Sequence, residues 1–243
     1  MTKMKAVILA AGKGTRMQSE LPKVLHEINH KPLAQYVKEA AKEAGAEEIC
    51  YVVGYQRERV QEVLADVDVT FAVQEEQLGT GHAVKCAKEF IGEEGDVMIL
   101  CGDTPLITGK TLADAMAFHK KAGNAVTVLS AELDDPTGYG RIIRDANGTF
   151  VKSVEHKDAT AAERETKEVN AGMYFFRAKE LFQTLDLLRA DNAQGEYYLP
   201  DTLELILARG GRVDAYVLPD PVELSGVNTP EQLAEAAKVI AGR

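Results

Sequence analysis

The sequence predicts an α/β protein with a mixed, mainly parallel β-sheet flanked by helices. Three observations predict this class. Strand-like runs alternate with helix-like stretches over residues 5–121, which is the pattern of right-handed βαβ units. The first run, Lys5–Ala10, is short and apolar and opens into a glycine-rich loop, as a buried parallel strand does. Further along, Asn147-Gly148 separates two short strand-like runs and predicts an antiparallel hairpin.

The first half of the chain is predicted to supply the parallel part of the sheet. Pro32 suits the first turn of a helix, and Gly45 suits the end of the same helix. The expected strands are Lys5–Ala10, Glu48–Val53, Thr70–Val73 and Asp96–Cys101, with a loop at Ala11–Leu21. The expected helices are Pro32–Ala44, Arg57–Leu64, Thr80–Phe90 and Lys110–Lys121.

The second half is predicted to extend the sheet with antiparallel strands. The last helix is expected to begin after a Thr229 cap, with Pro230 in its first turn, and to end near Ile240. Because no repeat, low-complexity segment or linker interrupts the chain, we expect one compact unit over residues 1–243. Its other elements are strands at Ala125–Ala131, Gly140–Arg144, Thr149–Val154, Val169–Phe176 and Arg212–Val217, and helices at Lys179–Leu188 and Tyr198–Arg209.

Composition excludes several classes of protein. The hydrophobic content of 45% and charged content of 27% are typical of a globular protein that needs no disulfide or metal to fold. Cys50, Cys86 and Cys101 show no metal or disulfide spacing, so we expect free thiols and a cytoplasmic location. No leader peptide is expected, and no apolar run approaches the roughly 20 residues of a membrane span.

The charge distribution is uneven along the chain. A formal net charge of −10 argues against nucleic-acid binding. Residues 1–31 nevertheless contain six basic side chains and only two acidic ones, Glu20 and Glu27. This segment suits a small polyanion, although chance clustering of solvated lysines would look the same. The basic residues are Lys3, Lys5, Lys13, Arg16, Lys23 and Lys31.

The loop after the first strand has the composition of a phosphate-binding loop. It runs Leu9-Ala10-Ala11-Gly12-Lys13-Gly14-Thr15-Arg16-Met17. Ligands of open parallel sheets bind at the carboxyl ends of the strands, and glycines let backbone N–H groups approach phosphate oxygens. Neither the P-loop pattern nor the G-x-G-x-x-G dinucleotide pattern fits, because Met17 takes the third glycine position. A purely structural turn is the alternative.

This loop, together with Leu21-Pro22-Lys23, resembles the L-x2-G-x-G-T-x-[ML]…P-K signature of sugar-1-phosphate nucleotidyltransferases. Other segments are similar to the uridylyltransferase domain of the bifunctional N-acetylglucosamine-1-phosphate uridylyltransferase/glucosamine-1-phosphate acetyltransferase family. The resemblance covers essentially the whole chain and implies a Rossmann-like sheet of the nucleotide-diphospho-sugar transferase type. The matching segments are Gln74–Ala83, Gly102–Leu106, Asp135–Arg141, Val154–Ala159, Asn192–Tyr198 and Gly226–Asn228.

The resemblance implies two lobes and one departure from the family. A nucleotide-binding lobe is expected over residues 1–110 and a sugar-binding lobe over residues 111–228. The family continues into a β-helix of hexapeptide repeats, and this sequence contains no such repeat. We therefore do not expect acetyltransferase activity, or the trimer that the β-helix builds, from this chain.

The implied reaction is an in-line attack of a sugar 1-phosphate on the α-phosphorus of a nucleoside triphosphate. The attacking phosphate is already an anion, so the protein must supply positioning and cationic stabilisation rather than a general base. The resemblance implies that Arg16 and Lys23 bind phosphates. It also implies that Asp103 and Asn228 hold Mg²⁺, a cation that prefers a few hard oxygen ligands from protein. From spacing alone, Asp103 and Asn228 could equally be turn or cap residues.

The resemblance also assigns the recognition of base and sugar. For the nucleotide it implies Leu9, Ala10, Ala11, Gly12, Gln74, Gly79 and Thr80, with the Gln74 amide complementary to the O4 and N3–H edge of uracil. For the sugar it implies Gly140, Glu155, Asn170, Tyr197 and Asn228, with Tyr197 closing the acetamide end. Cys101 takes a position often held by tyrosine in relatives. We expect the five histidines, which are His26, His30, His82, His119 and His156, to be structural or on the surface.

The resulting hypothesis is an enzyme that transfers UMP from UTP to N-acetylglucosamine 1-phosphate, giving UDP-N-acetylglucosamine and pyrophosphate with the help of Mg²⁺. One alternative keeps the chemistry but uses glucose 1-phosphate, or a thymidine or cytidine nucleotide. Another alternative is a module that binds nucleotide sugars without catalysis. The presence of Arg16, Lys23, Asp103 and Asn228 together favours the enzyme.

Overall fold

A mixed sheet forms the centre of the protein, whose computed structural model describes residues 3–243. Met1 and Thr2, which belong to the predicted N-terminal lobe, lie outside the described residues. The sheet has nine strands in this part of the chain. They are β1 (Lys5–Ala10), β4 (Glu48–Val53), β5 (Val69–Val73), β6 (Asp96–Cys101), β7 (Val126–Glu132), β8 (Arg141–Arg144), β9 (Phe150–Val154), β10 (Glu168–Arg177) and β11 (Val213–Val217).

The strand order is β11-β7-β10-β6-β1-β4-β5, with β8 paired to β10 and β9 paired to β8. Strands β6, β1, β4 and β5 are parallel to one another, and β11 is parallel to β7. Strand β10 runs antiparallel to β6, β7 and β8. The predicted mixed, mainly parallel sheet is therefore confirmed, and the carboxyl ends of β1 and β6 meet at one edge.

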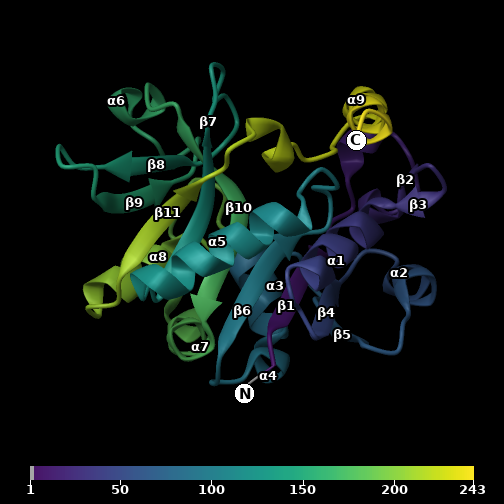
Figure 1. Cartoon of the computed structure of the whole chain (residues 1–243), viewed down its shortest axis with the longest axis horizontal. Coiled ribbons are helices and arrows are strands. Elements are labelled where there is room, and N and C mark those ends of the chain that lie inside the picture. Colours follow the sequence, from purple (N-terminus) through teal and green to yellow (C-terminus); the bar gives the residue numbers. More distant parts are fainter. Residues whose placement is uncertain (1–2) are drawn as a thin grey trace.

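Helices cover both faces of the sheet, so the molecule has three layers (Figure 1). Apolar side chains of α1, α2 and α5 pack on one face, and those of α3, α4, α7 and α8 pack on the other. The helices are α1 (Leu33–Glu43), α2 (Arg57–Leu64), α3 (Thr80–Cys86), α4 (Lys88–Ile91), α5 (Gly109–Ala122), α6 (Ala161–Arg164), α7 (Ala178–Thr184), α8 (Asp201–Ala208) and α9 (Pro230–Ala241).

A small third cluster joins the two ends of the chain. Helix α9 packs beside the short hairpin of β2 (Glu27–Ile28) and β3 (Lys31–Pro32), as Figure 1 shows. Val227 and Ala236 meet Ile28 and Leu33 in this cluster. The packing places the segment before α9 next to the loop that follows β1. Within residues 3–243, no helix combines the length and the apolarity that crossing a bilayer requires.

Most predicted elements are confirmed, and the main differences concern three predicted helices. The predicted helix over residues 80–90 is two helices, because Ala87 leaves helical geometry at φ −92° and ψ 10°. The helix predicted from Tyr198 begins at Asp201, because the Leu199 N–H donates to Thr80 Oγ1 at 3.1 Å instead of opening a helix. Helix α7 ends at Thr184, whose hydroxyl donates back to Glu180 O at 2.9 Å.

Candidate functional site

The predicted site residues gather at the carboxyl edge formed by β1 and β6. Leu9 and Cys101 are register partners on these neighbouring strands. Gly102 N donates to Leu9 O at 2.9 Å, which closes the two strands as the chain leaves β6. A Cβ on Gly102 would lie 2.8 Å from that oxygen, so only glycine allows this approach. The turn places Asp103 beside the loop that follows β1.

Four charged or polar side chains from distant parts of the chain form one cluster. Lys23 Nζ forms an ion pair with Asp103 Oδ2 and donates to Asn228 Oδ1 at 3.0 Å. Arg16 Nη2 donates to the same Asn228 oxygen at 2.9 Å. The side chains of Lys23 and Asp103 are each 18% exposed, so the pair is partly shielded from water. All four residues predicted to act on phosphates and metal are thus brought together.

The segment before α9 is tied to the turn after β6. Val227 N donates to Asp103 O at 2.8 Å, and Asn228 N donates to Gln232 Oε1 at 2.8 Å. A Cβ on Gly226 would lie 3.6 Å from Asp103 Oδ2, an ordinary contact. These contacts hold the Asn228 side chain opposite the Asp103 carboxylate.

The two glycines of the first loop have different roles. Gly14 has φ +70°, and a Cβ there would lie 2.6 Å from the Cβ of Lys23. Glycine at this position therefore allows the backbone turn and leaves room for the Lys23 side chain. Gly12 lines a cavity, and a Cβ on it would meet no atom within 4 Å. Its missing side chain leaves open space rather than relieving a clash.

A cavity of about 330 Å³ lies over the first loop and contains the predicted nucleotide contacts. Gln74 is 3% exposed, and its Nε2 donates to Gly79 O at 3.1 Å. Gly79 has φ +106°, and a Cβ there would lie 2.7 Å from Tyr197 O, so no larger residue fits. The lining residues that were predicted from the sequence are Leu9, Ala10, Ala11, Gly12, Lys23, Gln74, Gly79, Thr80 and Asp103.

A second cavity of about 220 Å³ adjoins the first and shares Leu9, Thr80 and Cys101 with it. Gly140 lies just before β8 and Glu155 just after β9, so the predicted hairpin delivers both residues to this cavity. A Cβ on Gly140 would lie 3.3 Å from Glu155 Oε1. Burial, followed by the charges of Asp158, Asp201 and Glu196, raises the pKa of the Glu155 carboxyl.

Asn170 contributes to the same cavity from an irregular stretch of β10. The pairing register of β10 shifts between Asn170 and Tyr174, and a bulge beside a site is a common way to direct side chains. Asn170 is 6% exposed; its Nδ2 donates to Ser153 Oγ at 3.0 Å, and its Oδ1 accepts from Gly172 N at 2.8 Å. These bonds hold the amide in one orientation at the cavity wall.

Cys101 lies at the boundary of the two cavities. Its Sγ donates to Gly172 O at 3.2 Å. Burial raises the pKa of the thiol to about 12, and the nearby charge of Asp103 acts in the same direction. A neutral thiol at this position is a small, unreactive part of the cavity wall.

Tyr197, predicted to contact the sugar, does not line the second cavity. Its ring lies against His82, with 6.4 Å between ring centroids, and both residues line a third cavity of about 440 Å³ on the other side of α3. His82, expected to be structural or on the surface, contacts a residue of the first cavity, because its Nδ1 lies 3.1 Å from Gln74 Nε2. No spacing in the sequence signals this contact, which depends on how α3 packs.

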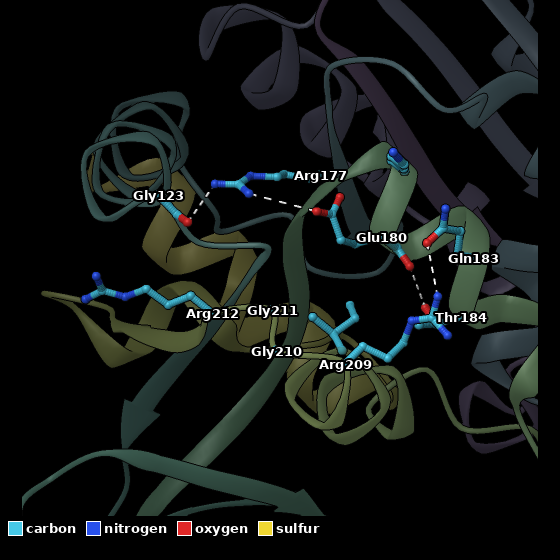
Figure 2. A pocket seen from close by; sticks show the side chains of 11 residues that line it. Gly123, Arg177, Glu180, Gln183, Thr184, Arg209, Gly210, Gly211 and Arg212 are labelled. Carbon is cyan, nitrogen blue, oxygen red and sulfur yellow. Dashed lines mark hydrogen bonds and ion pairs between the residues drawn. The ribbon is translucent and has the colours of Figure 1, made fainter.

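A larger cavity, of about 680 Å³, lies at the opposite edge of the sheet, near the amino end of β6 (Figure 2). It is rich in arginine, but Arg177 Nη2 donates to Gly123 O at the end of α5, at 2.6 Å. Arg209 Nη2 donates to Gln183 Oε1 at 3.2 Å. The contact of Arg177 is typical of a basic side chain at a helix carboxyl end, and none of the predicted site residues lines this cavity.

Comparison with known proteins finds similar sequences over most or all of the chain. The model of the nucleotidyl transferase family matches residues 5–221. The bifunctional protein GlmU of Caldanaerobacter subterraneus subsp. tengcongensis is 51% identical over 243 residues, which are 100% of this chain and 53% of that protein. The bifunctional protein GlmU of Thermoanaerobacter pseudethanolicus is 48% identical over 237 residues, which are 98% of this chain and 51% of that protein. The chain therefore spans about half the length of the curated relatives it matches.

Proposed function

The chain belongs to the nucleotidyl transferase family, and on that premise we propose that it transfers UMP from UTP to N-acetylglucosamine 1-phosphate. The products are UDP-N-acetylglucosamine and pyrophosphate. The observation that carries the proposal is the cluster of Arg16, Lys23, Asp103 and Asn228, whose Lys23 and Asp103 line the nucleotide cavity. The adjoining second cavity shares a wall with the first, so two substrates can meet there.

The side chains of the protein reduce the repulsion between the two anionic substrates and hold their phosphates in place. The oxygen of the sugar phosphate attacks the α-phosphorus as the bond to the β-phosphate oxygen breaks, and no proton has to be removed from the nucleophile. Lys23, at the nucleotide cavity, pairs with phosphate oxygens near the reacting centre. Arg16, which is exposed at the outer side of the cluster, binds the departing phosphates. Two cations at this point reduce the repulsion between the anionic substrates.

The same cluster fits a divalent cation. Asp103 Oδ2 and Asn228 Oδ1 both contact the Lys23 ammonium, so two hard oxygens already converge on a positive charge. Mg²⁺ typically takes one or two protein oxygens and keeps its other positions for water and phosphate. We propose that Asp103 and Asn228 hold Mg²⁺. When bound, the ion supplies charge neutralisation at the phosphates.

In this proposal the first cavity binds the nucleotide and is called the nucleotide cavity, and the second binds the sugar and is called the sugar cavity. Gln74, Gly79, Thr80 and the Leu9–Gly12 segment bind the uridine part, and Gly140, Glu155 and Asn170 bind the sugar. The nucleotide cavity is lined mostly by residues before 110, which supports a nucleotide-binding lobe at about 1–110 and a sugar-binding lobe at about 111–228. Glu196 is an exception to this division because it lines the nucleotide cavity, and Leu9, Thr80 and Cys101 are exceptions because they also line the sugar cavity.

The direct test is pyrophosphate release from UTP with Mg²⁺, with N-acetylglucosamine 1-phosphate and glucose 1-phosphate supplied separately. Release with the first sugar phosphate and much less with the second supports the proposal as far as the sugar cavity. Release with glucose 1-phosphate alone would keep the chemistry and contradict the sugar assignment. No release with either, from a folded sample, would contradict the proposed reaction.

A further inference from the structure

The orientation of the Gln74 amide is determined by its surroundings. Its Nε2 faces Gly79 O at 3.1 Å, and a carbonyl oxygen can only accept, so the atom facing it must be the amide nitrogen. The same nitrogen faces His82 Nδ1 at 3.1 Å. With both amide hydrogens directed at Gly79 and His82, Oε1 is the atom of this side chain that is left for a ligand. Gln74 lines the nucleotide cavity, where a base can use that oxygen.

His82 must therefore be an acceptor at Nδ1, with its ring proton on Nε2. A donor at Nδ1 would favour the opposite orientation of the amide, with Oε1 toward His82 and the NH₂ group available to the base. Gly79 O opposes that orientation, and His82 provides the second of two contacts that prevent it. The selected orientation presents an acceptor to the base.

The position of His82 is fixed by packing at the start of α3. Gly81 N donates to Tyr197 O at 2.7 Å, and Tyr197 N donates to Leu78 O at 2.8 Å. A Cβ on Gly81 would lie 2.5 Å from Leu188 Cδ1, so this turn of the helix packs closely against its neighbours. The Tyr197 ring then lies against the imidazole. Tyr197 therefore lies next to the residues proposed to bind the base, and not next to those proposed to bind the sugar.

We infer that His82 is a positioning residue that makes the site selective for uridine over cytidine by holding Gln74 Oε1 toward the base. This inference rests on the proposed function, since it concerns the base of the nucleoside triphosphate. Uracil presents an N3–H donor, which an amide oxygen accepts. Cytosine presents an unprotonated N3 at the same position, which an amide oxygen repels. Thymine has the same N3–H as uracil and is not distinguished by this contact.

The test compares kcat/KM for UTP and for CTP in His82→Phe, which keeps a ring against Tyr197 and removes the acceptor. We expect kcat/KM for UTP to fall about three- to tenfold, the effect of one hydrogen bond, while CTP loses less or gains. The UTP-to-CTP ratio therefore falls. The change should lie mainly in KM, because the contact is made in the bound substrate as well as in the transition state. His82→Asn, whose side-chain oxygen can accept near the Nδ1 position, should restore most of the ratio.

A double-mutant cycle separates positioning from general damage. In a Gln74→Ala background, His82→Phe should have little further effect on the ratio, because the side chain it positions is absent. Lys85→Ala is the matched control, since Lys85 lies on the same helix and lines the same third cavity but pairs with Asp186 at 3.0 Å. It should leave the ratio unchanged. If His82→Phe does not fold, His82→Leu replaces it in every arm.

Three results would overturn the inference. One is an unchanged UTP-to-CTP ratio in a folded and active His82→Phe enzyme. Another is an equal loss for both nucleotides, and the third is full additivity of His82→Phe with Gln74→Ala. These results are distinct from failure of the proposed function, which would appear as no pyrophosphate release by the unmodified protein with UTP and either sugar phosphate.

Discussion

At the scale of single residues, the site depends on contacts between parts of the chain that are far apart in sequence. Arg16 and Asn228 share a hydrogen bond across 212 positions, and Lys23 and Asp103 form an ion pair across 80 positions. Motif resemblance predicted each of these residues separately. The convergence of Arg16 and Lys23 on one Asn228 oxygen could not be read from spacing, because it depends on the packing of α9 beside β2 and β3.

Replacing Asp103 tests the cluster directly. Asp103→Ala should lower kcat for pyrophosphate release by at least about 100-fold, the usual cost of losing one charged group that acts on the transition state. The measurement is turnover at saturating Mg²⁺ and substrates, with the circular dichroism spectrum as the check on folding. Near-normal turnover by a folded variant would contradict the assignment of Asp103 to the metal and phosphate site.

Gly12→Ala should separate function from stability. A Cβ at this position meets no atom within 4 Å and the backbone is not in the left-handed region, so the melting temperature should change by about 2 °C or less. The added methyl group enters the nucleotide cavity, and KM for UTP should rise by about tenfold or more. Gly14→Ala is the comparison, because its φ of +70° and a contact of 2.6 Å with Lys23 should reduce both stability and activity. Unchanged KM in Gly12→Ala would show that phosphate does not approach this residue.

At the scale of secondary-structure elements, one buried carboxylate joins the two segments that hold the cluster. Glu223 belongs to a 3-10 turn, Pro221–Leu224, and is 7% exposed. Its carboxylate accepts from Thr108 N at 3.0 Å and from Thr111 Oγ1 at 2.9 Å, both in the first turn region of α5. The turn lies just before Asn228, and α5 lies just after Asp103. Glu223 therefore ties the segment before Asn228 to the segment after Asp103.

Glu223→Gln should destabilise the protein and weaken the site together. The new amide offers only one acceptor oxygen and brings two hydrogens toward groups that are themselves donors. We expect a loss of about 1.5–3 kcal/mol in the free energy of unfolding, since charged hydrogen bonds are lost. Denaturant titration measures that loss, and KM for Mg²⁺ should rise in parallel. Glu235→Gln, an exposed carboxylate that pairs with Lys238, is the control and should change neither quantity.

The sequence predicted the regular elements better than their interruptions. Strands β4 and β6 and helix α2 have the predicted bounds, because apolar runs and flanking loop residues determine them locally. The break at Ala87, the late start of α8 and the hairpin of β2 and β3 were not predicted. The late start of α8 depends on a partner elsewhere in the fold, because Leu199 N donates to Thr80 Oγ1. The contact of His82 with Gln74 escaped prediction for the same reason.

At the scale of the whole molecule, basic residues lie at the proposed phosphate site and acidic residues lie around the proposed sugar cavity. The protein has a formal net charge of −10, yet Arg16 and Lys23 place two cations where phosphates are proposed to bind. Acidic residues gather instead around the sugar cavity. Asp201, at the start of α8, lies near Asp158 and Glu204, and burial together with these charges raises its pKa to about 6. A carboxylate held there at neutral pH opposes folding.

The sign of this effect determines how stability depends on pH. The ordinary pKa of Asp201 is 3.8, so below that value the residue is protonated in both folded and unfolded chains and contributes nothing. As the pH rises from about 4 to 6, the unfolded chain ionises first, and the folded state loses stability relative to it. Above about 6 the full destabilisation remains. Asp201→Asn should remove it.

We therefore expect Asp201→Asn to melt at a higher temperature than the unmodified protein at pH 7 and at the same temperature near pH 4. Asp201 is partly open to solvent, and the first turn of α8 itself favours a carboxylate, so we discount the expected gain in stability to about 1 kcal/mol, or about 2–4 °C in melting temperature.

The change in stability caused by Glu163→Gln should have the opposite sign. Lys152 and Thr160 lower the pKa of Glu163 to about 2, so that variant should lose stability at pH 7 and recover as the pH falls below about 4.5. Thermal unfolding of both variants at pH 7 and pH 4 measures the two slopes. If Asp201→Asn were no more stable than the unmodified protein at pH 7, the acidic surroundings of the sugar cavity would not be a cost to folding.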